Sequence, residues 1–302
     1  MIMHVTFRNY KANPLFGEDY HALRQFLIKL DSHNYHFGRW DWMITHGYLD
    51  KSGLPYIGLW EDKGVIVAAA TYDCSLGAAF LLMSEGYRHL GEEMLLYAKD
   101  AFAKDGKFKA LILDGDMELQ ETAARNGFCP TQDKECDAIY PIDNDKIQNA
   151  LPEGFTVTSM ADTYDLYKYG QVLWKGFNHE ANGEGPFIFK QEELPEWEIG
   201  FKRPNVNLDL KIAVVAPNGD FVSYCGMWQD GASQSALVEP VATDPAYRKM
   251  GLGRAAVLEA VRRCGALGAK RAFVGSSQQF YYSIGFRPYA TSTWWEQKYS
   301  KS

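Results

Sequence analysis

The stretch SALVEPVATDPAYRKMGLGRAAVLEAVRRCGALG, residues 235–268, decides how this chain folds. Its first nine residues are mostly apolar and predict a buried strand over 235–243. From Gly251 onward, apolar residues recur at the 3.6-residue spacing of an amphipathic helix. A glycine turn that opens a helix exposes backbone N–H groups that the helix cannot pair, at the positive end of its dipole. The stretch therefore predicts a turn that binds an anion.

Three phosphate-binding motifs compete for this turn. The pattern Gly-x-Gly-x-x-Ala at residues 251–256 partly matches a dinucleotide fingerprint, but residues 243–250 separate it from the strand. The next predicted strand, 271–275, also lacks the acidic residue that this fingerprint requires. A P-loop is excluded because no Gly-Lys-Ser/Thr follows. What remains is Arg-x-x-Gly-x-Gly, in which Arg248 and Lys249 add positive charge to the backbone donors.

The second half of the chain alternates predicted strands and helices around this stretch. The predicted elements are a strand at 154–160, a helix at 161–177, a hairpin of 208–216 with 221–229, a helix at 251–268, a strand at 271–275, a short helix, and a β region that ends in Trp294 and Trp295. A strand, helix, strand crossover predicts parallel strands within a mixed sheet that helices cover.

The first half repeats this order with weaker signals. Arg88 corresponds to Arg248, Gly91 to Gly251, and the Gly-Phe pair at 127–128 to that at 285–286, at an offset of 158 to 160 residues. A constant offset indicates an internal repeat. The segment 141–152 is the predicted linker, so we expect domains at 1–142 and 152–302.

The composition narrows the class of protein. A chain of 302 residues, 46% hydrophobic, is long enough for two domains. The net charge of −7, all of it in residues 1–151, argues against nucleic acid as a partner. Five cysteines without a C-x-x-C pair argue against a disulfide framework and a metal site. The N-terminus lacks a signal peptide and no apolar run is long enough for a membrane span, so we expect a cytoplasmic protein. The sequence carries no signal of an oligomeric state.

Two segments resemble one family. Residues 236–255, ALVEPVATDPAYRKMGLGRA, are similar to the strand, pyrophosphate loop and helix of the GNAT superfamily of N-acetyltransferases. Residues 280–286, FYYSIGF, are similar to its Tyr-x-x-x-Gly-Phe segment. The resemblance implies acetyl-CoA as co-substrate and direct transfer of acetyl to an amine. The predicted fold class is α/β, with two GNAT-like domains that each hold a mixed β-sheet flanked by helices.

Pro240 interrupts the predicted strand 235–243. Because proline donates no hydrogen bond to a neighbouring strand, we expect a bulge there. In the family, two parallel strands diverge at this point and the pantetheine arm enters the gap. The resemblance implies that the strand and the following loop bind the cofactor through Val241, Ala242, Thr243, Arg248, Lys249, Met250, Gly251, Leu252, Gly253 and Arg254. A plain helix start after residue 245 is the alternative interpretation of the loop.

Acetyl transfer to an amine requires a base, an oxyanion site and an acid. An alkylammonium with a pKa of about 10 must lose a proton before it attacks a thioester. Glu239, two residues before Val241 on the same strand face, is the candidate base; a water relay, or a structural role for this carboxylate, is the alternative. A backbone N–H near the bulge is the candidate oxyanion donor. Tyr281, four residues before Gly285, stands where the resemblance implies the acid that protonates the coenzyme A sulfur, whereas Tyr282 is expected to pack.

The first half departs from the pattern at both sites. Glu93 stands where the loop needs its second glycine, and it would bring a negative charge against a pyrophosphate. Ala123 stands where the acid is expected, four residues before Gly127. We therefore predict that the first domain is non-catalytic and that each chain binds one acetyl-CoA.

Residues 174–200 occupy the position of the variable arm that covers the acceptor in the family. The arm carries six glutamates and two lysines, so a polycationic amine such as an aminoglycoside or a polyamine is one expected acceptor. A solvated helix face is the alternative interpretation. Trp174, Asn178 and Glu180 are the candidate substrate contacts. A protein or peptide amine, a longer acyl-CoA, and a coenzyme A sensor without turnover remain open, although Tyr281 favours an enzyme.

Overall fold

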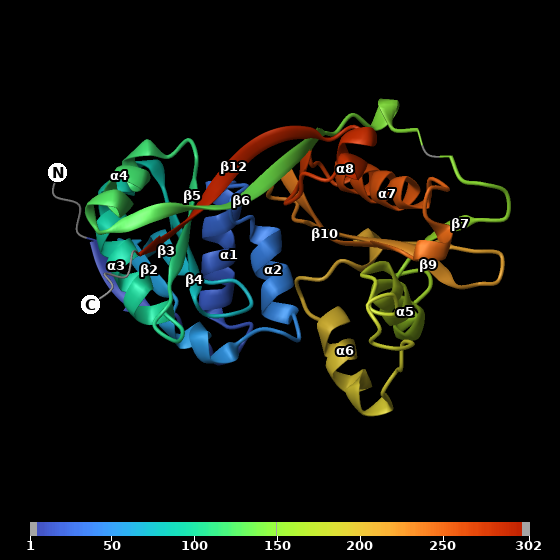
Figure 1. Ribbon diagram of the computed structural model, residues 1–302, viewed down its shortest axis with the longest axis horizontal. Coiled ribbons are helices and arrows are strands. Elements are labelled where there is room, and N and C mark those ends of the chain that lie inside the picture. The colour runs from blue at the N-terminus through green and yellow to red at the C-terminus, as the bar shows by residue number, and fades with distance from the viewer. Residues whose placement is uncertain (1–4, 149, 298–302) are drawn as a thin grey trace. The chain divides into compact units, whose positions relative to one another are not determined.

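The computed structural model describes residues 5–148 and 150–297, without the side chain of residue 196. The chain forms two compact units. Among the described residues, unit 1 contains 5–138, 275–277 and 288–297, and unit 2 contains 139–148, 150–274 and 278–287. Figure 1 shows the fold from its N-terminal residues in blue to its C-terminal residues in red.

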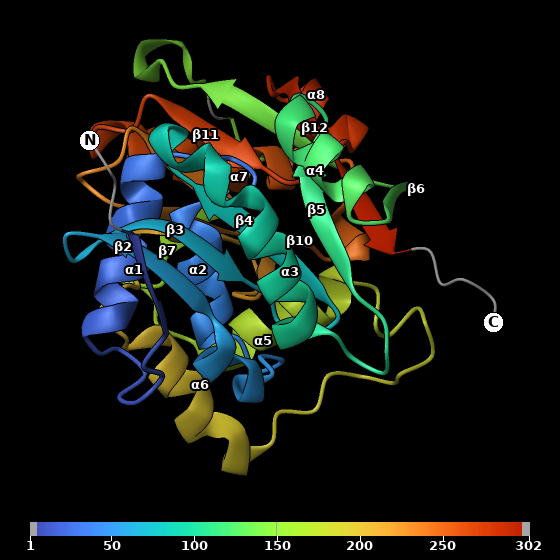
Figure 2. The same ribbon diagram turned by 90° about the vertical axis from the view of Figure 1, so that its left-hand side faces the viewer.

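Unit 1 has one mixed sheet with helices on both faces. Its elements are β1 (Val5–Asn9), α1 (Glu18–Leu30), α2 (Phe37–Thr45), η1 (Lys51–Tyr56), β2 (Gly58–Asp62), β3 (Val65–Thr71), β4 (Ala78–Met83), η2 (Glu85–Leu90), α3 (Gly91–Phe102), β5 (Lys109–Leu113), α4 (Met117–Arg125), most of β6 (Phe128–Pro141) and most of β12 (Arg287–Gln297). The strand order runs β1-β2-β3-β4-β5-β12, and only the β4–β5 pair is parallel among these. Helix α3 packs on β3 and β4 (Figure 2), and α1 packs on β3 from the other face (Figure 1).

Unit 2 repeats this arrangement. Its elements are η3 (Asn144–Lys146), β7 (Thr156–Ser159), α5 (Leu166–Gly176), η4 (Gln191–Glu193), α6 (Leu194–Phe201), η5 (Leu208–Leu210), β8 (Lys211–Val215), β9 (Phe221–Gln229), β10 (Ser235–Thr243), η6 (Pro245–Tyr247), α7 (Leu252–Ala266), β11 (Arg271–Val274) and α8 (Gln279–Ser283). The strand order is β7-β8-β9-β10-β11, with only β10–β11 parallel among these pairs. Helix α7 covers one face of β8, β9 and β10, and α5 covers the other (Figure 1). The predicted fold class and the internal repeat are confirmed.

Local sequence signals located most elements well. Strands β9 and β10 have the predicted limits of 221–229 and 235–243. The predicted hairpin of unit 2 turns at Gly219, which has a φ of 87° that favours glycine. Helix α5 begins at Leu166 rather than at 161, because the side chain of Asp165 accepts a hydrogen bond from the Lys168 N–H and caps the helix there.

The C-terminal strand is assigned differently from the predicted ranges 1–142 and 152–302. Residues 288–297 belong to unit 1, where Ser292–Glu296 of β12 pair with Leu113–Lys109 of β5. Trp294 and Trp295 are each 8% exposed and are part of the hydrophobic core of unit 1. The reason is burial, since these two indole rings pack among apolar side chains of the first half.

Candidate active site

Strand β10 carries the expected bulge at Pro240. Its pairing with β9 shifts register between Val238 and Val241, which confirms the predicted irregularity. Its parallel pairing with β11 extends only as far as Leu237 opposite Phe273. The two parallel strands therefore stop pairing just before the bulge, and the second half of β10 has a free edge on that side.

Along residues 241–244, the backbone N–H and C=O groups of alternate residues point towards β9 or towards the opposite edge. In an antiparallel pair, every second residue directs its N–H and C=O towards the partner strand. The Asp244 N–H donates to the Val222 carbonyl of β9 at 3.0 Å, so Asp244 and Ala242 face β9. Val241 and Thr243 consequently direct their backbone groups away from β9, towards the unpaired edge. These are the two strand residues whose backbone was expected to bind an extended ligand.

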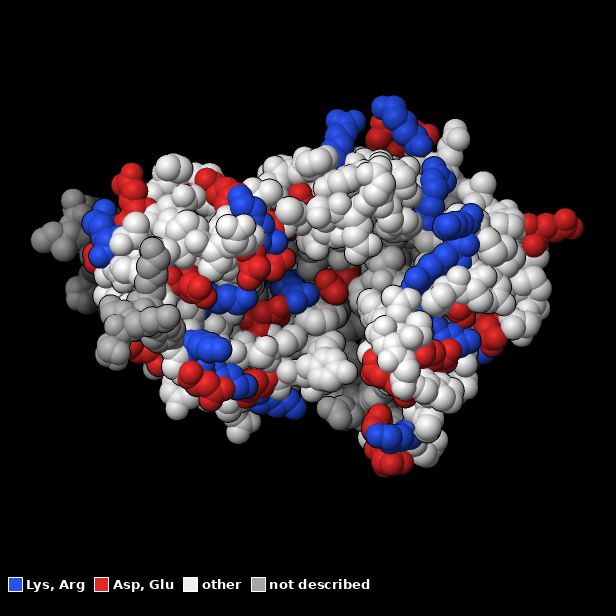
Figure 3. Space-filling view, viewed as in Figure 1, with Lys and Arg blue, Asp and Glu red and all other residues white. Residues whose placement is uncertain are grey.

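The loop after β10 opens helix α7 with a left-handed turn. Gly251, the N-cap of α7, has a φ of 83°, and Lys249 has a φ of 64°. Within the helix the Ala255 N–H donates to the Gly251 carbonyl, so the N–H groups of residues 251–254 precede the first intrahelical bond. These donors lie at the positive end of the α7 dipole, which suits a pyrophosphate. Lys and Arg side chains also gather over α7 in Figure 3.

Two glycines let the loop and α5 approach β10 closely. A Cβ atom at Gly253 would lie 3.0 Å from Thr243 Oγ1 and 3.3 Å from the Phe280 ring. A Cβ atom at Gly176, the last residue of α5, would lie 2.6 Å from the Ala242 Cβ and 2.8 Å from the Thr243 nitrogen. The end of β10 is therefore held between the start of α7 and the end of α5.

The other predicted cofactor residues take different positions. Arg248 donates to the Gly176 carbonyl at 2.8 Å and to Asn178 Oδ1 at 2.9 Å, so its guanidinium connects the loop to the end of α5. Arg254 donates to the Gln148 carbonyl at 3.0 Å. The Leu252 side chain is buried, whereas Met250 is 41% exposed. Only the backbone of Leu252 is therefore accessible to a ligand.

Tyr281 lies on α8, beside the start of α7. Its side chain is 8% exposed, and its ring packs 5.5 Å from the Phe286 ring between centroids. The Phe286 N–H donates to the Tyr281 carbonyl at 3.0 Å, after a turn at Gly285 with a φ of 113°. Burial raises the pKa of Tyr281 above its ordinary value, and the nearby Cys225 and Glu239 act in the same direction. The phenol is therefore protonated at neutral pH and able to donate a proton.

Glu239 lies within electrostatic range of two tyrosines. Its negative charge contributes to the raised pKa of Tyr281 and, after burial, to that of Tyr169 on α5. Its carbonyl accepts a hydrogen bond of 3.0 Å from the Trp228 indole N–H. The structure therefore brings the candidate base and the candidate acid into one region beside the bulge.

The buried pair of Trp228 and Lys211 was missed in the sequence. Lys211 is 3% exposed, donates to the Met227 carbonyl at 2.9 Å and lies 3.5 Å from the Trp228 ring centroid. The ammonium packs on the indole that binds the Glu239 carbonyl, so both residues support the bulge. The strand containing Trp228 was recognised, but only the register of β9 with β10 reveals this contact.

The predicted substrate contacts lie at and after the end of α5. The Trp174 ring stacks 4.2 Å from the His179 ring, and its N–H donates to the Gly185 carbonyl at 3.0 Å. Asn178 accepts a hydrogen bond from Arg248, and Glu180 is exposed. The structure therefore links Asn178 to the loop and leaves Glu180 at the surface.

The corresponding loop of unit 1 has a different conformation. Gly91, the counterpart of Gly251, is helical with a φ of −55°. Arg88 forms an ion pair with Asp116, and Glu93 accepts a hydrogen bond of 2.8 Å from the Trp60 indole N–H. Both polar side chains therefore have partners within unit 1, and the left-handed turn of unit 2 is missing at this position.

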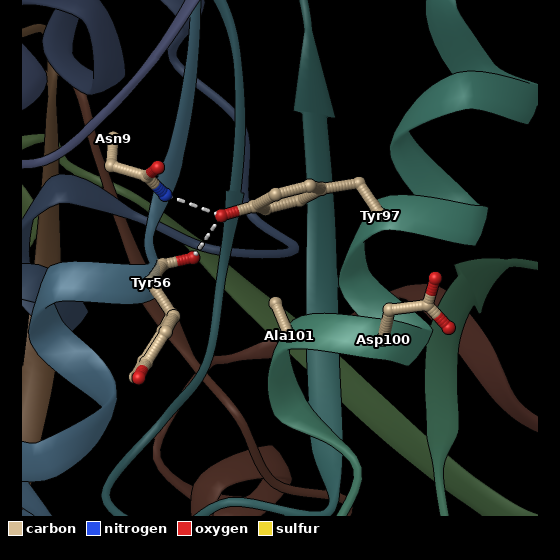
Figure 4. Close-up of a pocket in the computed structure, with 5 residues that line it drawn as sticks. All are labelled: Asn9, Tyr56, Tyr97, Asp100 and Ala101. Atoms are coloured by element: carbon tan, nitrogen blue, oxygen red, sulfur yellow. Dashed lines mark hydrogen bonds between the residues drawn. The ribbon is translucent and has the colours of Figure 1, made fainter.

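A pocket of about 560 Å³ lies in unit 1 between β1, η1 and α3. It is lined by Asn9, Tyr56, Tyr97, Asp100 and Ala101 (Figure 4). The Tyr97 hydroxyl accepts from Asn9 Nδ2 at 2.5 Å and donates to the Tyr56 carbonyl at 2.8 Å. The pocket contains none of the predicted site residues. The hydrogen-bond partners of the Tyr97 hydroxyl, Asn9 and Tyr56, also line this pocket.

Two classes of feature are missing from the part of the chain that the structure describes. No three His, Cys, Asp or Glu side chains form a group that could hold a metal ion there. No helix among residues 5–148 and 150–297 has the length and hydrophobicity that crossing a membrane requires.

Comparison with known families identifies the class of this fold and site. Residues 174–286 match the acetyltransferase (GNAT) family, and this match covers the last turn of α5, the bulge, the glycine loop and Tyr281. Residues 174–286 therefore form a segment of the GNAT acetyltransferase family, and this match supports an acyl-CoA-dependent acetyltransferase. Among curated proteins, no relative is found by sequence.

Solved structures show the same fold over the whole chain. A tandem GNAT protein from the clavulanic acid biosynthesis pathway has a TM-score of 0.61 at 14% identity and covers 99% of this chain and 100% of its own. A GCN5-related N-acetyltransferase from Sphaerobacter thermophilus has a TM-score of 0.56 at 14% identity, covering 97% and 95%. An N-myristoyltransferase of Saccharomyces cerevisiae with bound myristoyl-CoA has a TM-score of 0.55 at 12% identity, covering 98% and 79%. At these low sequence identities, the structural similarity shows a shared fold and nothing about the substrate.

Proposed function

We propose that unit 2 is an N-acetyltransferase domain that moves an acetyl group from acetyl-CoA directly to a primary amine of a small molecule. The observation that carries this proposal is the unpaired edge of β10 between the α7 N-terminus and the buried Tyr281. A thioester supplies an activated acetyl group when the co-substrate is bound. The chain itself binds the co-substrate and transfers the protons of this reaction.

Residues at the end of β10 and the start of α7 bind the co-substrate in this proposal. The backbone groups of Val241 and Thr243 pair with the extended arm of coenzyme A as an additional strand would. The N–H groups of residues 251–254 bind its pyrophosphate, and Lys249 adds positive charge. Gly253 and Gly176 fit this assignment, because a side chain at either position would push on Thr243 or Ala242.

Glu239 and Tyr281 divide the proton transfers. Glu239 accepts the proton of the substrate ammonium, directly or through a water, because a neutral amine is the nucleophile. Tyr281 donates a proton to the departing sulfur, because its phenol lies beside the bulge and is protonated at neutral pH. A backbone N–H freed by the bulge supports the negative charge that develops on the carbonyl oxygen.

Unit 1 is proposed to be a non-catalytic domain. The helical Gly91 and the hydrogen-bonded Glu93 do not provide the loop of free N–H donors that unit 2 has. Ala123, at the position that corresponds to Tyr281, is fully buried and has no proton to donate. Its contribution to the enzyme is structural in this proposal.

The proposal is tested by thiol release from acetyl-CoA with the full chain and a panel of amines. The panel contains arylalkylamines, amino acids, polyamines, aminoglycosides and a lysine-containing peptide. We expect thiol release that depends on a small amine, with the acetylated amine detected by mass spectrometry. Acetyl-CoA binding without turnover for every amine would instead indicate a sensor, and turnover with the peptide alone would indicate a protein acetyltransferase. Comparison of acetyl-CoA with longer acyl-CoA molecules establishes the donor.

A further inference from the structure

The segment between α5 and β8 carries an aromatic cluster that the proposed mechanism does not use. We define the aromatic arm as Tyr167, Tyr169, Phe187, Phe189, Trp197 and Phe201. These residues come from α5, from the loop that follows it, and from α6. Figure 1 shows α6 beside α5 on the face of the sheet opposite α7.

The aromatic arm begins next to the bulge. The Tyr169 ring lies 4.9 Å from the Tyr224 ring of β9, and Tyr224 is paired with Ala242 of β10. Tyr169 also lies two helical turns before Gly176, on the same face of α5, and Gly176 approaches Ala242 closely. The negative charge of Glu239 adds to the effect of burial in raising the pKa of Tyr169. The inner end of the arm therefore lies beside the proposed base.

The rings continue from Tyr169 towards the surface. Tyr169 contacts Phe201 at 4.7 Å and Trp197 at 6.2 Å between ring centroids. Trp197 lies 5.7 Å from Phe189, and Phe187 lies 5.6 Å from Tyr167. This spacing is typical of interacting aromatic pairs, so the rings form one connected apolar surface.

Gly170 permits the rings to close on α5. A Cβ atom at this position would lie 2.6 Å from atoms of the Phe187 and Trp197 rings. Glycine inside a helix is less favourable than alanine, and this contact explains its presence. The close contact of these rings with the α5 backbone therefore depends on Gly170.

Three of the six glutamates in residues 174–200 are paired with basic side chains. Glu184 lies 2.9 Å from His179, Glu193 lies 3.1 Å from Lys190, and Glu198 lies 2.7 Å from Lys202. Figure 3 shows acidic and basic side chains next to one another over α6. These three pairs reduce the negative field that would attract a polycation.

The outer edge of the aromatic arm is apolar and open to solvent. Tyr167 is 46% exposed, and the neighbouring residues Ile188 and Ile199 are 73% and 57% exposed. Exposed apolar patches of this kind mark binding surfaces, and small-molecule sites are mostly apolar with a few placed polar groups. The one carboxylate placed at the inner end is Glu239.

We infer that the acceptor of this enzyme is a primary amine that carries an aromatic ring. The ring packs on the aromatic arm, and the amine lies beside Glu239. This inference rests on the proposed function, and it selects an arylalkylamine rather than an aminoglycoside or a polyamine. The aromatic arm then determines specificity, while the bulge and the loop hold the acyl donor.

Steady-state kinetics of the full chain test this inference. At saturating acetyl-CoA we expect kcat/KM for 2-phenylethylamine to exceed that for n-propylamine and spermidine by about tenfold or more, because only the first buries an aromatic ring. Tyr167→Ala should raise the KM for 2-phenylethylamine about fivefold and leave kcat unchanged. Its n-propylamine kinetics should not change. Tyr48→Ala, at a residue of unit 1 that is 82% exposed, is the matched control and should alter neither substrate.

The outcomes separate the two proposals. A preference for spermidine, or equal selectivity in wild type and Tyr167→Ala, overturns the aromatic inference and leaves the proposed N-acetyltransferase in place. Turnover with no amine at all overturns the proposed function, and the aromatic inference with it. A loss of 2-phenylethylamine selectivity in Tyr167→Ala alone supports both.

Discussion

Tyr281 illustrates how position sets the chemistry of a single residue. The phenol is buried on α8, and its raised pKa follows first from burial and then from the neighbouring Cys225 and Glu239. A tyrosine is protonated at neutral pH with or without this shift, so the proposed acid role rests on the position of the phenol. Tyr282, the next residue, is partly exposed and provides an internal comparison.

Replacement of the Tyr281 hydroxyl tests this assignment. We expect Tyr281→Phe to lower kcat about 100-fold, the lower end of the range for a general acid, with a smaller change in the KM for acetyl-CoA. Tyr282→Phe is the matched control and should retain the wild-type kcat. If Tyr281→Phe retains full turnover and Tyr282→Phe loses it, the acid has been assigned to the wrong tyrosine. Thermal unfolding of both variants shows whether the fold is intact.

At the scale of elements, the site depends on how closely α5 and α7 approach β10. Gly176 and Gly253 are the contact points, and neither is required by a positive φ. Glycine is therefore needed at these two positions because a side chain would not fit, and not because of the backbone conformation. Gly251 differs, because its φ of 83° favours glycine although a Cβ there would meet nothing within 4 Å.

A methyl group at Gly176 should disturb the unpaired edge of β10. We expect Gly176→Ala to destabilise the chain by about 1–3 kcal/mol and to raise the KM for acetyl-CoA, because the new Cβ would press on Ala242 and Thr243. Gly200→Ala is the control, since α6 has open space at that position and alanine favours a helix. Urea unfolding and steady-state kinetics provide the measurements. Equal effects of the two substitutions would contradict the proposed contact.

At the scale of the whole molecule, one fold occurs twice with different sites. The pairing of β1 to β5 repeats that of β7 to β11, including the single parallel pair in each set. The loops that follow β4 and β10 differ, because Gly91 is helical and Gly251 is left-handed. The repeat thus preserves the sheet and changes the residues that would bind a ligand.

This difference predicts the stoichiometry of binding. Isothermal titration of the full chain with acetyl-CoA should give one site per chain, because the unit 1 loop lacks the free donors and carries Glu93. Gly251→Ala should weaken this site by straining the left-handed turn at a cost of about 1–2 kcal/mol. Two equivalent sites per chain would show that unit 1 also binds the co-substrate.

The assignment of β12 to unit 1 predicts where a C-terminal substitution acts. Trp295→Ala should lower the free energy of unfolding by about 3–5 kcal/mol, because the indole is buried in the unit 1 core. Tyr289→Ala, on the same strand and 51% exposed, should have little effect. Hydrogen exchange should show the loss of protection in β5, the strand paired with β12. Loss of protection confined to unit 2 would contradict this assignment.

Buried tyrosines in both units predict a loss of stability at alkaline pH. Burial raises the pKa of Tyr20 and Tyr35 in unit 1 and of Tyr224 and Tyr281 in unit 2. A folded-state pKa above the unfolded value means that the stabilisation is fully present below about pH 10 and is lost as the pH rises further. Urea midpoints should therefore be similar at pH 8 and 9 and lower at pH 11. An unchanged midpoint at pH 11 would contradict the burial of these phenols.

Much of unit 2 could be predicted from local sequence. The bulge follows from Pro240 within an apolar run, and the loop follows from the glycines that open the helix after Arg248. The partners of Arg248 could not be predicted, because Gly176 and Asn178 are about 70 residues away in sequence and reach the loop only through α5. Helix α6 was missed as well, since it is only eight residues long and contains Pro195 and Gly200, which disfavour a helix.

By itself, the sequence determined the strand, loop and helix at 235–268, because their signals lie within a short window. It also indicated the repeat of the two halves through a constant offset of 158 to 160 residues. The tertiary structure alone decided that β12 belongs to unit 1, that Trp228 and Lys211 support the bulge, and that the aromatic arm begins beside Glu239. Those features depend on burial and strand register between distant segments, and such contacts have no periodicity that a single sequence displays.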